Sequence, residues 1–375
     1  MPRWTAGATP SGRRSPGTGA VRSGLRIWSS ALVLGAILAV AAWAGEHREE
    51  RPPGEYGSAA LGLPAEEAQP GLPAPTVSPA PAVTPQPRWP VTIAAVGDIM
   101  LARSVSAAIT PEQPDGPFAH VREILRSADL TVGNLECAIS DGGFAEPKSY
   151  TFRAPPLAAS GLAVAGFDLV SLANNHSLDF GRDALLDTIE TLRLASVAVV
   201  GAGRDAGEAY GYRVLVTKGV RVAFLAMGEV PNEGGYNMRT WTAAPAEPGI
   251  AWADEERLAA TVREAAEAAD IVVVMFHFGV EGSTEPSGRQ RQLARSAIDA
   301  GANLVVGSHP HLLQEVEAYG RGLIAYSLGN FVFDGFEGEA NESGILLVGF
   351  AADGSLSWRM EPVTIGLDGL PRPGP

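Results

Sequence analysis

The sequence predicts an α/β domain in which a mostly parallel or mixed sheet is covered by helices. Short, β-branched apolar runs bounded by Gly, Asn or Asp indicate buried strands. Amphipathic stretches between several of these runs indicate helices. A hydrophobic fraction of 46% against a charged fraction of 19% leaves enough apolar residues for a substantial core.

The apolar runs define the expected elements in chain order. The principal strands are predicted at residues 91–96, 128–132, 167–172, 271–276, 303–306 and 322–327. Further strands are predicted at 222–227, 344–350 and 355–360, with the last two in one sheet. One helix is expected over 254–269 with Asp254 as its N-cap, and another over 287–300, ended by Gly301.

The N-terminal region predicts export of everything that follows it. Residues 1–26 contain arginines and no acid, and their Gly, Ser and Pro content argues against packed structure. The apolar run 27–45 approaches the roughly 20 residues that span a bilayer. The arginines precede it and acidic residues follow it, so we expect a single-pass anchor in the cell membrane with an extracytoplasmic C-terminal part. A signal peptide cleaved after Ala44, which would release a secreted protein, is the alternative.

Composition divides the rest of the chain. Residues 46–89 are rich in Pro and Ala and are predicted to form an extended linker, followed by a folded domain at 90–367 and a tail at 368–375. Cys137 is the only cysteine, which excludes an intramolecular disulfide. The formal net charge of −14 argues against a nucleic-acid partner.

Unusual polar residues stand at the ends of the predicted strands. They include four of the six histidines together with an Asp and a Glu: Asp98, Glu136, His176, His277, His309 and His311. Each alone has an ordinary explanation as a turn, a cap or a structural histidine. Ligands bind at the carboxyl ends of strands in open α/β sheets, and imidazole with carboxylate suits Zn, Mn or Fe. The repetition therefore predicts a site for one or two divalent ions.

The polar residues belong to a series of ordered motifs: Gly97-Asp98-Ile99-Met100, Gly133-Asn134-Leu135-Glu136, Asn174 to Gly181, His277-Phe278-Gly279, Gly307-Ser308-His309-Pro310-His311 and Gly329-Asn330-Phe331. This series resembles the capsule-synthesis CapA family, also called poly-γ-glutamate capsule proteins of the PgsA type. The resemblance covers about residues 90 to 365. That family is similar to the calcineurin-like metallophosphoesterases, which implies a four-layer α/β/β/α sandwich with mixed sheets.

The resemblance implies a role for each motif residue. The metal ligands would be Asp98, Glu136, Asn175, His277, His309 and His311, whereas His176 with Asp179 would be catalytic. Substrate contacts are expected from Arg103, Asn134, Arg153 and Asn330, with Lys148 as a further candidate anion contact; the alternative for the three cations is solvated surface. The sequence departs from the metallophosphoesterase pattern at Met100, where those enzymes carry a metal-binding His.

Two classes of function follow from this resemblance. The first is a metal-dependent hydrolase or transferase acting on phosphoryl or acyl groups of an anionic polymer or phosphoester during capsule or poly-γ-glutamate synthesis and export. The second is a non-catalytic component of a membrane-bound polymer synthesis or export complex. A third hypothesis is a general exported metallophosphoesterase with no role in capsule synthesis. In the first two, proteins of the membrane synthesis machinery are the expected partners.

Overall fold

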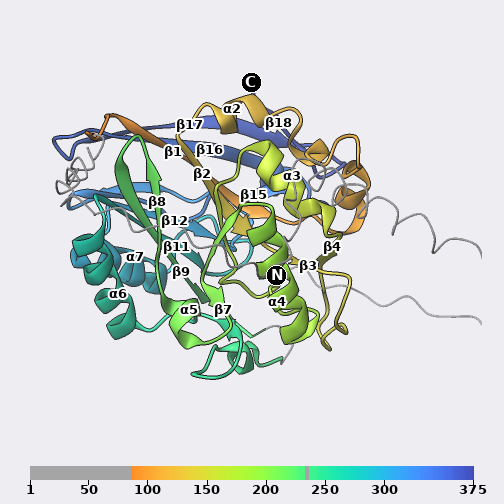
Figure 1. Ribbon diagram of the computed structural model, residues 1–375. Coiled ribbons are helices and arrows are strands. Elements are labelled where there is room, and N and C mark those ends of the chain that lie inside the picture. The colour runs from red at the N-terminus through yellow and green to blue at the C-terminus, as the bar shows by residue number, and fades with distance from the viewer. Residues whose placement is uncertain (1–85, 233–235) are drawn as a thin grey trace, which may run out of the picture. The chain divides into compact units, whose positions relative to one another are not determined.

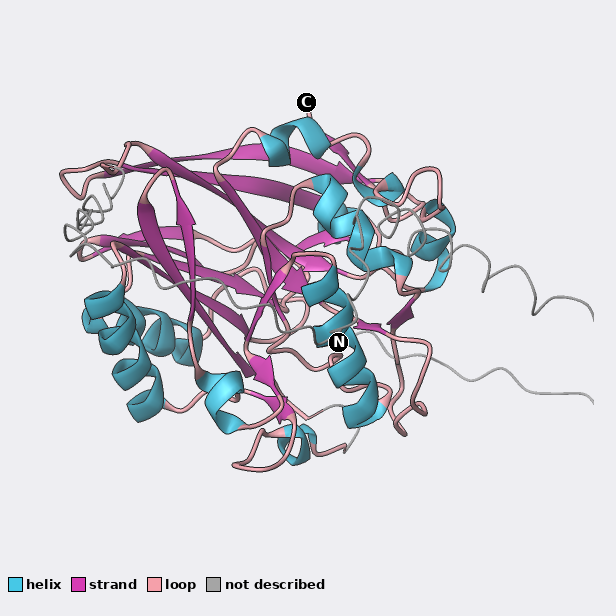
Figure 2. Ribbon diagram, in the orientation of Figure 1, coloured by secondary structure: helices cyan, strands magenta, loops and turns pink. Residues whose placement is uncertain are grey.

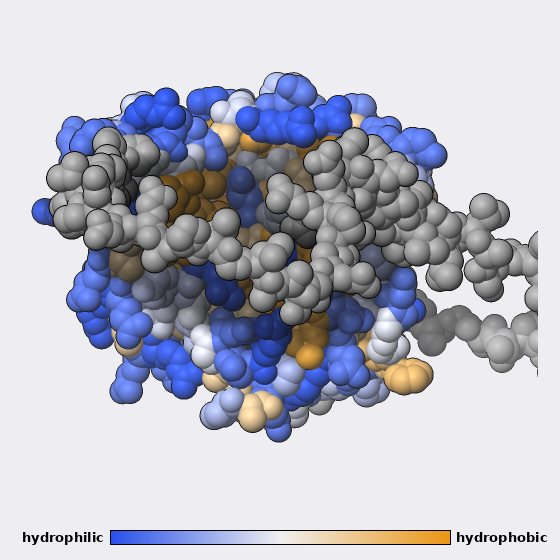
Figure 3. Space-filling model, viewed as in Figure 1, coloured by the Kyte–Doolittle hydropathy of each residue, from blue (hydrophilic) through white to orange (hydrophobic). Residues whose placement is uncertain are grey.

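The computed structural model describes residues 86–232 and 236–375. The predicted N-terminus at 1–26, the apolar run 27–45 and most of the predicted linker lie outside the described residues. Two large sheets face each other, and helices cover their outer faces (Figure 1, Figure 2). Figure 3 shows that the visible part of one face is mainly hydrophilic, with apolar residues in recesses between the polar ones.

The first sheet contains parallel and antiparallel pairs. Its strands are β1 (Val91–Ile99), β2 (Leu130–Leu135), β5 (Leu169–Ser171), β6 (Ala198–Val200), β15 (Asn330–Val332), β16 (Glu342–Phe350), β17 (Leu356–Ile365) and β18 (Pro371–Pro373). They follow the order β18-β17-β16-β1-β2-β5-β6, with β15 also paired to β1. The pairs among β1, β2, β5, β6 and β15 are parallel, whereas the pairs that add β16, β17 and β18 are antiparallel.

The second sheet is also mixed. Its strands are β8 (Arg213–Thr217), β9 (Val220–Glu229), β11 (Ile271–Phe278), β12 (Leu304–Ser308), β13 (Val316–Tyr319) and β14 (Gly322–Ala325). The order is β13-β14-β12-β11-β9-β8, with parallel central pairs and an antiparallel strand at each edge. Two small sheets pair β3 (Ala138–Ile139) with β4 (Arg153–Ala154), and β7 (Ala202–Gly203) with β10 (Gly249–Ile250).

Helices form the two outer layers. Those beside the first sheet are η1 (Arg103–Ala108), η2 (Gly116–Phe118), α2 (Arg122–Arg126), α3 (Leu157–Ala165) and α4 (Gly181–Leu194). Those beside the second sheet are α5 (Ala206–Tyr210), α6 (Glu255–Ala268) and α7 (Gly288–Ala300). The turns η3 (Met238–Trp241) and η4 (Gly338–Asn341) lie in connections. The expected caps are confirmed: Asp254 accepts a hydrogen bond from the Arg257 N–H, and Gly301 ends α7.

The core explains why the central strands are almost continuously apolar. In β1, Ile93 and Ala95 pack between the sheets, whereas Ala94 and Val96 pack against the helices of the first outer layer. The residues of β11 divide in the same way between the inter-sheet core and the core under α6 and α7. Strands buried on both faces need apolar residues at every position. Three core layers between four structural layers confirm the predicted α/β/β/α sandwich with mixed sheets.

All the predicted strands and both predicted helices form, with shifted ends. β1 extends to Ile99, so Asp98 lies inside the strand. Residues 371–373, within the segment predicted as a tail, pair with β17 as the edge strand β18. Within residues 86–232 and 236–375, no helix combines the length and apolarity needed to cross a membrane.

Candidate functional site

The motif residues collect where strands of the two sheets end side by side. They lie on or just after β1, β2, β5, β11 and β12: Asp98, Asn134, Glu136, Asn175, His176, His277, His309 and His311. Gly97 permits the close approach of β1 to the segment before β15, because a Cβ there would lie 1.9 Å from the Gly329 carbonyl oxygen. The structure thus brings together all six predicted metal ligands.

Asp98 is a fully buried carboxylate at the centre of the site. Its Oδ1 accepts a hydrogen bond from Asn134 Nδ2 at 2.8 Å, and its Oδ2 accepts one from the His309 N–H at 3.1 Å. Burial raises the pKa of Asp98, but the polar contact with His277, the nearby His311 and the hydrogen bond from Asn134 outweigh it and hold the pKa below its usual value. Asp98 is therefore ionised and negative at neutral pH.

Glu136 is a second fully buried acid of the site, and the burial of its carboxyl group is not compensated by hydrogen bonds. Neither of its carboxyl oxygens has a hydrogen-bond partner among the described residues. Burial, followed by the charge of Asp98, raises the pKa of Glu136 well above its usual value. A buried polar group without a partner is costly, and a bound cation would remove that cost. The residues present therefore fit a metal ion.

His277, His309 and Asn175 converge on one point. His277 Nε2 lies 2.7 Å from Asn175 Oδ1 and 3.1 Å from His309 Nδ1, and it is 3.9 Å from Glu136 Oε1. Burial lowers the pKa of His277 and, more strongly, that of His309, whose pKa the charges of His277 and His311 lower further. Both imidazoles are thus held neutral, which is the form that coordinates metals.

His311 belongs to a second cluster that shares Glu136. Ligand atoms of Asp98, Glu136 and His311 all lie within 4.8 Å of one another, so this buried group can hold a metal ion. His311 Nδ1 lies 2.8 Å from Asn330 Oδ1, which fixes the orientation of the ring. His309 and His311 have φ values of 98° and 58°, and such left-handed backbone in residues other than glycine often marks functional sites.

Met100 lies outside both clusters. Its side chain is fully buried in the core between the first sheet and the outer helices. Its sulfur accepts a hydrogen bond from the Ala102 N–H at 3.2 Å. Met100 is therefore a core residue, and the group of Asp98, Glu136 and His311 that can hold a metal ion does not include it.

His176 faces the site with its orientation fixed from behind. Asp179 Oδ2 lies 2.7 Å from His176 Nδ1 and also accepts the Phe152 N–H, whereas Asp179 Oδ1 accepts from Lys148 Nζ at 2.7 Å. The side chains of Lys148 and Asp179 are fully buried. With its Nδ1 proton directed at Asp179, His176 presents Nε2 toward Glu136, 3.8 Å from Oε1.

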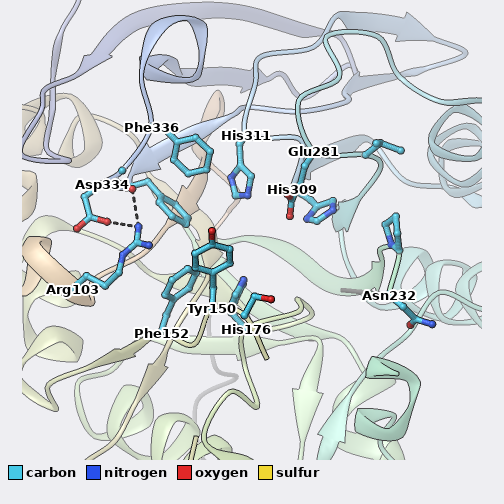
Figure 4. A pocket seen from close by; sticks show the side chains of 15 residues that line it. Arg103, Tyr150, Phe152, His176, Asn232, Glu281, His309, His311, Asp334 and Phe336 are labelled. Carbon is cyan, nitrogen blue, oxygen red and sulfur yellow. Dashed lines mark hydrogen bonds and ion pairs between the residues drawn. The ribbon is translucent and has the colours of Figure 1, made fainter. Parts of the chain in front are cut away.

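A cavity of about 600 Å³ opens beside the histidines. His176, His309 and His311 line it together with the aromatic side chains of Tyr150, Phe152 and Phe336, as Figure 4 shows. Phe333 is a further aromatic residue in the lining. Arg103 also lines the cavity. The other predicted substrate contacts do not line the cavity. Asn134 and Asn330 are buried and form hydrogen bonds with the side chains of Asp98 and His311, respectively. Arg153 stacks on Phe180, with its Cζ 4.3 Å from the ring centroid.

Comparison with known proteins gives the chain its family. The family model of the bacterial capsule synthesis protein PGA_cap matches residues 92–335, which contain every residue of the two clusters. The chain belongs to this family. It is 33% identical to the PGA biosynthesis protein CapA of Bacillus subtilis over 275 residues, which cover 72% of this chain and 70% of the relative.

Two further relatives extend the PGA_cap family likeness. The capsule biosynthesis protein CapA of Bacillus anthracis is 32% identical over 294 residues, covering 76% of this chain and 69% of the relative. A probable polyglutamine synthesis accessory protein of Mycobacterium tuberculosis is 31% identical over 258 residues, covering 65% of this chain and 66% of the relative.

Sequence reasoning missed the walls of the cavity in this PGA_cap domain. The sequence does not show that Tyr150, Phe152, Phe333 and Phe336 line a cavity, because their spacing does not distinguish a cavity wall from a core. Asp334 and Glu281 were also missed. Both lie within a few residues of a motif, Asp334 after Gly329-Asn330-Phe331 and Glu281 after His277-Phe278-Gly279, and this proximity is the sequence signal that points to them.

Proposed function

We propose that this chain is a metal-dependent hydrolase or transferase that acts on an anionic polymer or its precursors during synthesis or export of a poly-γ-glutamate-type capsule. One observation carries the proposal: the buried Glu136 carboxylate has no hydrogen-bond partner among the described residues, yet it stands between two groups of ligand-type side chains. A protein that lacked a cation there would retain an uncompensated buried acid.

The proposed ligands divide between two positions. Asp98, Glu136 and His311 would hold one ion, whereas Glu136, Asn175, His277 and His309 would hold another, of Mn, Zn or Fe type. Such ions lower the pKa of bound water and polarise phosphoryl or acyl oxygens. Elemental analysis of the purified chain gives the identity and the number of the ions.

The chain's own residues supply proton transfer and orientation. Asp179 holds the Nδ1 proton of His176, so Nε2 is the atom that gives or takes a proton in the cavity. Lys148 and the Phe152 N–H fix Asp179 in turn. Stacking of Phe152 on the His176 ring, at 4.2 Å between centroids, keeps the imidazole in this orientation.

The proposed setting is the outer face of the cell membrane. The names of the relatives link them to capsule, PGA or polyglutamine synthesis. The apolar run 27–45 and the Pro/Ala-rich segment 46–89 would tether the domain beside membrane proteins of the same machinery.

Turnover by the purified full-length chain tests the catalytic proposal. We expect Mn- or Zn-dependent hydrolysis of phosphodiester or γ-glutamyl substrates, lost in His277→Ala and His309→Ala. Arg153→Gln is the matched control, because Arg153 lies outside the cavity. Metal-dependent turnover that both histidine variants retain would contradict the proposal.

A non-catalytic role in the same complex is the second candidate. The observation that favours it is Met100, which leaves one metal position without the usual histidine. Normal capsule output from a His309→Ala strain, together with a membrane partner that co-purifies with both wild type and variant, would support a structural role. Loss of capsule with retention of that partner would support catalysis.

A further inference from the structure

The cavity has two chemically different ends. Figure 4 shows His309 on one side and Arg103 with Asp334 on the other, with His176 and His311 between them. A ligand long enough to span the cavity from the histidines would contact the Arg103 guanidinium.

Arg103 is held in position from its own end of the cavity. Its Nη2 donates a hydrogen bond to the Asp334 carbonyl oxygen at 2.7 Å and forms an ion pair with the Asp334 carboxylate. The Asp334 carboxylate also accepts the Ser104 N–H at 3.0 Å. Arg103 has a φ of 51°, a left-handed backbone conformation that is uncommon outside glycine and persists only where surrounding contacts hold it.

Two aromatic rings fix the guanidinium further. Arg103 Cζ lies 4.8 Å from the ring centroid of Phe152 and 5.6 Å from that of Phe333. These cation–π contacts immobilise a side chain that otherwise has large rotamer freedom, so little entropy remains to be lost when a ligand binds.

The fixed guanidinium retains unused donors. Its contacts with Asp334 engage Nη2, whereas Nε and Nη1 have no hydrogen-bond acceptor among the described residues. The side chain is 36% exposed and lines the cavity. A guanidinium has five N–H donors, and those left over suit a ligand oxyanion.

We propose that Arg103 binds a carboxylate of the substrate at a distance from the group that reacts at the histidines. The inference rests on the proposed function, because it adds a subsite to the same cavity. The Asp334 carboxylate makes the Arg103 subsite neutral overall, and it repels a dianion more than a monoanion. The subsite therefore favours a carboxylate over a dianionic phosphate monoester, and the substrate is an oligomer or conjugate that carries side carboxylates.

A cycle of two proteins and two ligands isolates the Arg103 contact. The ligands are a γ-linked glutamate tetramer and the same tetramer with its side carboxylates replaced by carboxamides. Calorimetric titration into the full-length wild type should show about 10-fold to 100-fold tighter binding of the carboxylate form. Arg103→Gln should reduce that preference to about 2-fold or less, because its neutral amide hydrogen-bonds both ligands equally.

Three controls keep the result interpretable. Arg153→Gln removes a stacked arginine outside the cavity and should leave the preference unchanged. Asp334→Asn removes the negative charge that repels dianions, and should weaken the discrimination against a dianionic phosphate monoester. Unchanged melting temperature and metal content show that each variant is folded. A wild type without preference, or an Arg103→Gln variant that keeps it, would overturn the subsite.

Glycerol 3-phosphate, a phosphate monoester that is mostly a dianion at pH 7.5, distinguishes the other source of an oxyanion. Its affinity should change less than about 2-fold in Arg103→Gln, and a loss as large as that of the carboxylate ligand would overturn the selectivity for carboxylate. Failure of the proposed function is separate: a chain that binds no metal yet shows the carboxylate preference would refute the metal site and leave the subsite standing.

Discussion

At the scale of single residues, the site contains three buried acids that differ in the hydrogen bonds and ion pairs available to their carboxyl groups. Asp98 has hydrogen-bond donors on both oxygens, whereas Glu136 has none among the described residues. Asp179 is compensated by Lys148, His176 and a backbone N–H. Glu136 is therefore the acid that needs a bound cation, whereas protein groups already provide hydrogen-bond partners for Asp98 and Asp179.

Glu136→Gln should stabilise the metal-free protein, and by more as pH rises. The raised pKa of Glu136 means that the folded chain keeps a proton that the unfolded chain releases above about pH 4.5. Stability is therefore lost as pH rises from that value through the folded pKa. Urea unfolding after chelation, at pH 5 and pH 7.5, measures the difference. Equal pH dependence in both proteins would contradict the uncompensated acid.

Lys148→Met should destabilise the fold by about 3 kcal/mol or more, because it leaves Asp179 buried without its cation. The matched control is Arg193→Met, which breaks the exposed ion pair between Arg193 and Glu190. It should change the unfolding free energy little. Denaturant unfolding measures both variants. A Lys148→Met protein as stable as wild type would show that Asp179 is satisfied without this lysine.

At the scale of elements, the positions of strands were predictable and their partners were not. The run 271–276 reads as a strand because it is short, apolar and β-branched, and it forms β11. The helix 287–300 follows from its caps, and Ser287 with Gln290 forms a full capping box. The edge strand β8 and the short helices α2 and α5 lack such a signal, since half-exposed or single-turn segments carry little periodicity.

The approach of β1 to the Gly329 segment gives a prediction at this scale. Gly97→Ala should destabilise the protein by about 1–3 kcal/mol and lower its metal content, because the added Cβ meets a backbone oxygen. Gly288→Ala at the start of α7 is the control, since nothing lies within 4 Å of its Cβ. Thermal unfolding and elemental analysis test both. Equal behaviour of the two variants would mean that β1 and the Gly329 segment can move apart at no cost.

At the scale of the whole molecule, the sandwich places the ends of two parallel strand groups against each other. Asp98 and Glu136 come from one sheet and His277 from the other, so ligand types distant in sequence meet at one edge. The meeting of these side chains was predictable, because each lies at or near the end of a recognisable strand, whereas their roles as metal ligands stay a prediction. The cavity was not, because Phe152 and Phe333 come from separate connections whose course depends on tertiary packing.

Elemental analysis of the purified full-length chain tests the central claim most directly. We predict at least one equivalent of Mn, Zn or Fe per chain, lost in Glu136→Gln and in Asp98→Ala and retained in Arg153→Gln. The metal should also raise the melting temperature, because an ion that binds only the folded chain stabilises it. A wild-type chain without metal, and with no affinity for added Mn or Zn, would contradict the account.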